Sequence, residues 1–86
     1  MQKRLNEVSA MFAKEVNRCR SIGGEVAYDL AGFLGFWGIA ALHNGKLQFA
    51  YDCLRESGEI LQAKKDPIGV RETHFWLEMC CLAKGD

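Results

Sequence analysis

The sequence predicts an all-α fold: a single domain, residues 1–86, of about four antiparallel helices that form either a helix-turn-helix solenoid or a small bundle. Apolar residues recur at steps of three and four along most of the chain. Glycine-containing turn signals separate these periodic stretches, and one proline with few long β-branched runs gives little support to a sandwich or barrel. A mass of 9.7 kDa leaves room for one small domain.

The first predicted helix, residues 2–21, is amphipathic. Its single apolar stripe consists of Leu5, Val8, Phe12, Val16 and Cys19. We expect the helix to end at Gly23-Gly24, because glycine adopts a left-handed backbone conformation at little cost.

The second predicted helix, residues 25–43, is apolar on more than one side and must therefore be covered on more than one face. Gly32, Gly35 and Gly38 lie inside it. Each costs about 1 kcal/mol relative to alanine in a helix interior. Close approach by another backbone is the usual reason for such a cost.

Two further helices follow. His43-Asn44-Gly45 is a turn signal, and the helical spacing resumes over residues 46–64. Asp66 and Pro67 then predict an N-cap followed by a first-turn proline, which begins a fourth helix over residues 68–83.

The charge balance argues against a nucleic-acid partner. Lys plus Arg and Asp plus Glu both number 11, so no overall field attracts the chain to phosphates. The basic side of the first helix is a weak patch that suits solvation or an acidic co-chaperone better than nucleic acid. It consists of Lys3, Arg4, Lys14, Arg18 and Arg20.

The sequence predicts a cytoplasmic protein without stable membrane insertion. The uninterrupted apolar stretch Leu30–Leu42 has 13 residues, whereas a membrane span needs about 20. The basic N-terminus is followed by an amphipathic pattern rather than the apolar core of a signal peptide. The cysteines lack the spacing of a disulfide framework, so free and mostly buried thiols are expected.

No motif for catalysis, metal binding or cofactor binding is present. His43 and His74 lack the short paired spacings with cysteine that zinc sites use. A cysteine–histidine nucleophile would also need an orienting third group and a pocket, to which nothing in the spacing points. The expectation is a protein that is not an enzyme and has no cofactor.

A shift of the chain by 40 residues places 36–45 over 76–85, with large, small and turn positions corresponding. Such a period is typical of an α-solenoid. Residues 31–62 resemble a tetratricopeptide repeat, in which Leu34, Trp37, Gly38 and Ala41 stand where that family has Trp, Leu, Gly and Tyr. The resemblance implies that Gly38 and Ala50 let the paired helices touch while Trp37 and Leu54 fill the space beside them.

In that register the first helices of successive units form an apolar concave face. Its members are Gly32, Gly35, Ile39, Leu42 and His43, followed by Glu72, Phe75, Met79, Leu82 and Ala83. Such a protein resembles the tetratricopeptide-type chaperones of type III secretion needle subunits. Gly23–Leu30 is also similar to a stretch of flagellin export chaperones. Both resemblances imply a partner that is an exported helical protein or a co-chaperone.

The sequence therefore predicts a protein-binding chaperone or adaptor that buries an amphipathic helix of its partner. The expected contact residues are Ile39, Leu42, Phe75, Met79 and Leu82. Three alternatives remain open at this point. The apolar face is core, it joins copies of a structural homo-oligomeric module, or the chain is a small inhibitor or regulator of another protein.

Overall fold

The computed structural model describes residues 2–85 of the chain, with side chains from residue 7 onward. Four α-helices account for most of them: α1 (Gln2–Ile22), α2 (Ala27–His43), α3 (Leu47–Ala63) and α4 (Pro67–Lys84). A short 3-10 turn, η1 (Gly24–Val26), precedes α2. The described residues form no strand, so the predicted all-α class is confirmed. Helix ends differ from the predicted ones by one or two residues.

Most connections between helices are formed by the turn and capping residues from which the sequence predicted them. Gly23 and Gly45 have φ angles of 98° and 80°, in the region that favours glycine. Pro67 is the first residue of α4, and the Asp66 carboxylate accepts a hydrogen bond of 3.1 Å from the Gly69 amide. Lys65 is the exception, because it adopts a φ of 59° without being glycine.

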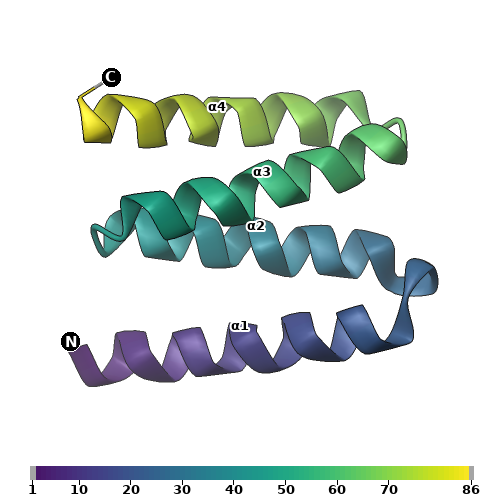
Figure 1. Cartoon of the computed structure of the whole chain (residues 1–86), viewed down its shortest axis with the longest axis horizontal. Coiled ribbons are helices and arrows are strands. Elements are labelled where there is room, and N and C mark those ends of the chain that lie inside the picture. Colours follow the sequence, from purple (N-terminus) through teal and green to yellow (C-terminus); the bar gives the residue numbers. More distant parts are fainter. Residues whose placement is uncertain (1, 86) are drawn as a thin grey trace.

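The helices lie side by side in chain order and alternate in direction, with α1 and α4 at opposite edges (Figure 1). The array measures 34 × 29 × 16 Å. Each helix packs on its sequence neighbours, and α2 also touches α4, but α1 does not reach α4. The described chain is therefore an open array and not a closed four-helix bundle.

Two apolar clusters hold the array together. Val16, Leu34 and Cys53 join α1, α2 and α3, with Leu30, Phe33, Trp37 and Ile60 packed around them. Ala41, Ala50, Leu54 and Cys80 join α2, α3 and α4. The central helices contribute to both clusters, whereas each edge helix contributes to one.

Helices α2 and α3 approach closely at Gly38. A Cβ atom on this residue would lie 2.7 Å from Leu54 Cγ and 3.2 Å from the Ala50 carbonyl oxygen. Trp37, next to it, is half-buried and turns toward α1, where its Nε1 donates to Ser9 Oγ at 3.2 Å. Its ring also meets Phe49 edge-on at 4.8 Å between centroids. Trp37 thus packs on both neighbours of α2, and Leu54 fills the space beside Gly38 together with Cys53, whose Cβ would lie 3.3 Å from the added atom.

The thiols belong to the packing. All four cysteines are free, and Cys19, Cys53 and Cys80 are buried. Burial raises the pKa of the Cys53 thiol to about 11, assisted by the nearby carboxylates of Glu56 and Asp52. Burial likewise raises the pKa of Cys80. Both thiols are therefore protonated at neutral pH and are poor nucleophiles.

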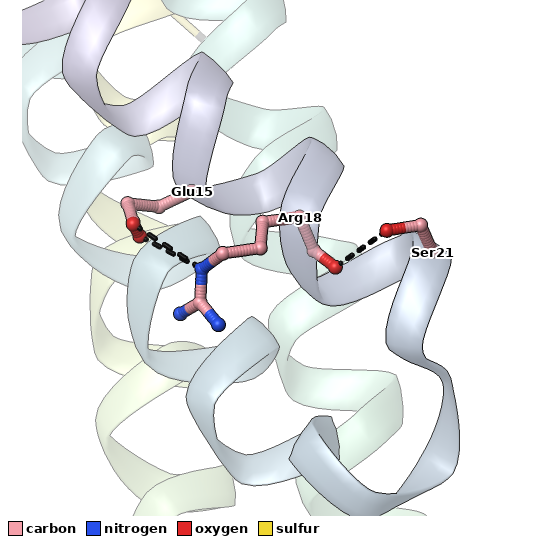
Figure 2. Close-up of polar contacts among 3 residues, drawn as sticks. All are labelled: Glu15, Arg18 and Ser21. Carbon is pink, nitrogen blue, oxygen red and sulfur yellow. Dashed lines mark hydrogen bonds and ion pairs between the residues drawn. The ribbon is translucent and has the colours of Figure 1, made fainter.

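The basic side of α1 is partly neutralised within the chain. Arg18 forms an ion pair of 3.1 Å with Glu15, and Ser21 Oγ donates to the Arg18 carbonyl at 2.9 Å (Figure 2). Arg20 donates hydrogen bonds to both carboxylate oxygens of Glu56 on α3, at 2.7 and 2.9 Å. Arg18 and Arg20 of the predicted patch therefore face acidic partners of the same chain, whereas the side chains of Lys3 and Arg4 lie outside those that the structure describes.

One stretch, Gly24–His43, is long and apolar enough to cross a membrane by length and composition alone. The window is longer than the uninterrupted run counted in the sequence, because it tolerates Glu25 and Asp29. Only 22% of it is fully buried inside the molecule, and most of the other residues are half-buried. Tyr28, Gly32 and Phe36 are among the residues that stay exposed, and they lie along one side of α2.

Candidate partner-binding groove

A groove of about 240 Å³ runs between α2 and α4, with α3 as its floor. Because α3 reverses the chain between them, α2 and α4 run parallel and present their sides to one another (Figure 1). The α2 wall consists of Tyr28, Ala31, Gly32, Gly35, Phe36 and Ile39. The floor consists of Leu54, Ser57 and Leu61, and the α4 wall of Gly69, Glu72, Thr73 and Trp76. We call this feature the α2–α4 groove.

The glycines of the α2 wall keep the groove open. A Cβ on Gly32 would have no atom within 4 Å, and one on Gly35 would lie 3.5 Å from Ser57 Oγ, an ordinary contact. Neither glycine has a positive φ. Packing within the described chain therefore explains Gly38 but does not require glycine at either groove position.

The polar groups of the floor and the α4 wall are already satisfied. Ser57 Oγ donates to the Ala31 carbonyl at 2.8 Å, and Thr73 Oγ1 donates to the Val70 carbonyl at 2.8 Å. No buried side-chain nitrogen or oxygen among the described residues lacks a hydrogen-bond partner. Glu72, which is exposed, is the one charged residue among those lining the groove. The groove thus offers apolar atoms and a single carboxylate.

Large apolar side chains form the solvent-exposed rim of the groove. Tyr28 and Phe36 on α2 are exposed, and Phe36 retains 64% of its accessible surface. Ile39 and Trp76 are half-buried and also support the cluster around Leu54. At the end of the groove His43 lies beside Trp76, with ring centroids 6.3 Å apart. An apolar partner would therefore contact aromatic edges as well as the floor.

The five predicted contact residues do not form one surface. Ile39 lines the α2–α4 groove, whereas Leu42 packs half-buried against the core cluster of Ala41 and Leu54. Phe75, Met79 and Leu82 lie outside the groove lining on an exposed side of α4. Each helical residue turns the chain by about 100°, so Trp76 faces the groove and Phe75 beside it does not.

The rest of the groove lining was predicted from the sequence only in part. Gly32, Gly35 and Glu72 belong to the predicted concave face and do line the groove. Tyr28, Phe36, Leu61 and Trp76 line it as well, although the sequence suggested only packing for Trp76. For the α2 residues, the sequence did contain an indication. Tyr28, Gly32 and Phe36 are spaced by four residues, which places all three along one side of α2.

A second pocket, of about 280 Å³, lies between α1, the C-terminal half of α2 and the start of α3, and Trp37 and Phe49 line it. The Trp37–Ser9 hydrogen bond crosses this region and joins the two helices. The described residues include no cluster of three or more His, Cys, Asp or Glu side chains arranged to hold a metal ion. The α2–α4 groove is therefore the candidate site on which a function is argued.

Comparison of the chain with protein-family models, with curated proteins and with solved structures found no match. The fold class is therefore known from the structure itself.

Proposed function

We propose that this protein is a chaperone or adaptor that binds an amphipathic helix of a partner protein in the α2–α4 groove. The observation that carries the proposal is the pair Gly32 and Gly35. Both lie in a helix interior, where each costs about 1 kcal/mol relative to alanine, and no contact within the described chain requires either. A partner helix lying against α2 would use the space that they leave.

The binding mode follows from the lining. A helix that enters the groove would place apolar residues at steps of three and four against Ile39, Leu61 and Trp76, with Phe36 closing over its edge. Because Glu72 is the charged lining residue, a lysine or arginine near the apolar face of the partner would complement it. We expect the partner to be an apolar helix bordered by a basic residue.

Such a partner suits a holding function. Burial of apolar surface contributes about 25 cal/mol per Å² before ordering costs, so a short helix can gain useful affinity from this groove. An exported helical subunit, which must be kept from aggregating before it is secreted, is the partner class that we propose from the resemblance to secretion chaperones. Its amphipathic helix would be covered while it occupies the groove.

The test uses a synthetic amphipathic peptide with leucines at helical spacing and one lysine beside them. A scrambled peptide of the same composition has no apolar face and serves as its control. Binding is measured with a Trp37→Phe variant, so that fluorescence reports Trp76, which lines the groove. We expect saturable binding of the amphipathic peptide and none of the scrambled one.

A matched pair of protein variants locates the binding surface. Gly32→Leu fills the groove from a position where no atom lies within 4 Å of the added Cβ, so folding should be preserved. Met11→Leu changes an exposed residue of α1, far from the groove lining, and is the control. Loss of peptide binding in Gly32→Leu alone supports the proposal. Equal binding in both variants, or equal binding of both peptides, contradicts it.

A further inference from the structure

A line of exposed apolar residues runs along the free edge of α4. Ile68, Phe75 and Leu82 are spaced by seven residues and therefore share one side of the helix. They retain 68%, 55% and 68% of their accessible surfaces. Met79, next to them on the groove side, retains 38%. We call these four residues the α4 seam.

The α4 seam faces away from the rest of the molecule. Thr73 and Cys80, the buried residues of α4, lie on its opposite side and point toward α3. The α4 helix is also an edge of the array, so no other helix of the described chain covers this side (Figure 1). The seam is thus a helix face with a heptad spacing and no partner in the described chain.

Two opposite charges flank the seam on the side away from the groove. Arg71 and Glu78 are separated by seven residues, so they lie on one line about 10.5 Å apart along the helix axis. Both side chains are exposed. The ion pairs among the described side chains are Glu15–Arg18 and Arg20–Glu56, which leaves Arg71 and Glu78 without one.

This charge arrangement is self-complementary. Ile68 and Leu82 lie seven residues to either side of Phe75, so a twofold axis at Phe75 places Ile68 of one copy opposite Leu82 of the other. Arg71 lies four residues before Phe75 and Glu78 three residues after it. In an antiparallel pair, Arg71 of each copy therefore comes level with Glu78 of the other to within one residue, about 1.5 Å.

We infer that the protein forms a symmetric dimer in which the α4 seam packs antiparallel against the α4 seam of a second copy. Two reciprocal Arg71–Glu78 ion pairs set the register of the two helices. The axis runs perpendicular to the layer of helices, because only that orientation keeps both charged flanks on the same side. Both α2–α4 grooves then open on the same face of the dimer.

The dimer differs from self-association through α2. The apolar side of α2 stays uncovered in it, so the groove remains available to a partner helix. The inference does not rest on the proposed function, since the seam and the groove use different residues. The two surfaces come nearest on α4 at Glu72, which lines the groove, and Met79, which belongs to the seam.

Light scattering of the full chain over a series of concentrations measures the dimer directly. A single pair of helices is a small interface, so we expect a monomer–dimer equilibrium in the micromolar range. Phe75→Glu should weaken dimerisation about tenfold or more, because it places a charge at the axis. Phe36→Glu, a matched change at an exposed residue of α2, should leave the dissociation constant unchanged and helicity intact.

Charge exchange tests the register. Arg71→Glu or Glu78→Arg alone makes both symmetric contacts repulsive, and each should weaken dimerisation about tenfold. The double variant Arg71→Glu, Glu78→Arg restores both contacts with the signs exchanged and should return to within about twofold of the parent chain. A mixture of the two single variants should form heterodimers in preference to either homodimer.

Several results would overturn the inference. A parent chain that stays monomeric at millimolar concentration has no such seam contact. Assembly that grows beyond the dimer indicates a head-to-tail contact between α4 and another surface. If the double variant dimerises no more tightly than the single variants, Arg71 and Glu78 do not pair across the dimer. Peptide binding in the groove would be unaffected by each of these results, so the two proposals fail separately.

Discussion

At the scale of single residues, the glycines of α2 divide into two kinds that the sequence does not distinguish. Gly38 lies where α3 comes so close that a Cβ would be 2.7 Å from Leu54 Cγ. Gly32, six residues earlier, has open space at the same position. Both glycines lie in the interior of the same helix. They differ only in whether a neighbouring helix lies against them, and this decides that Gly38 is needed for packing while Gly32 leaves the groove open.

This difference predicts opposite effects of the same substitution. Gly32→Ala should raise the free energy of unfolding by about 0.5–1 kcal/mol, because alanine is the better helix former. Gly38→Ala should lower it by about 1–3 kcal/mol, because the added methyl group forces α2 and α3 apart. Urea denaturation followed by circular dichroism measures both changes. A stabilised Gly38→Ala variant would mean that α2 and α3 are not in close contact there.

At the scale of elements, the helices and their ends follow from local signals. Asp66 and Pro67 begin α4 as an N-cap and a first helical residue, and Gly45 closes the turn after α2 with a positive φ. These features depend on side chains within a few residues of each other, which is why periodicity and capping preferences could predict them. The α3 end is different, because Lys65 adopts the left-handed conformation that is usually glycine's.

The strained end of α3 predicts a stabilising substitution. A left-handed conformation costs a residue with a Cβ about 1–2 kcal/mol. Lys65→Gly should therefore raise the free energy of unfolding, by about 0.5–1 kcal/mol once the greater freedom of glycine in the unfolded chain is included. Lys64→Gly removes the same charge at a residue with φ of −83° and should destabilise the protein instead. Thermal unfolding of both variants makes the comparison, and equal shifts would contradict it.

At the scale of the whole molecule, stability should decrease from the centre of the array to its edges. Helices α2 and α3 contribute to both apolar clusters, while α1 and α4 each contribute to one. Arrays of this kind derive their stability from contacts between neighbours, so edge helices can open without the rest. This arrangement leaves α1, which packs mainly on α2, as the least supported helix.

Hydrogen exchange under native conditions tests that gradient. We expect backbone amides of α2 and α3 to exchange slowest and those of α1 to exchange fastest, with α4 between them. Denaturant at low concentration should leave the exchange of α1 unchanged while it accelerates that of α3, because only the latter requires extensive unfolding. A single rate limit shared by all four helices would show instead that the chain opens as one unit.

The sequence by itself determined the class, the number of helices and most of their ends, because these depend on periodicity and capping within a few residues. It also indicated that α2 would need cover on several sides. Only the tertiary structure decided which side stays uncovered. A step of one residue turns a side chain by about 100°, so Trp76 and Ile39 face the groove while Phe75 and Leu82 form a separate surface. Contacts between helices that are far apart along the chain decide which side of each helix is covered, and a local sequence pattern holds no information on such contacts.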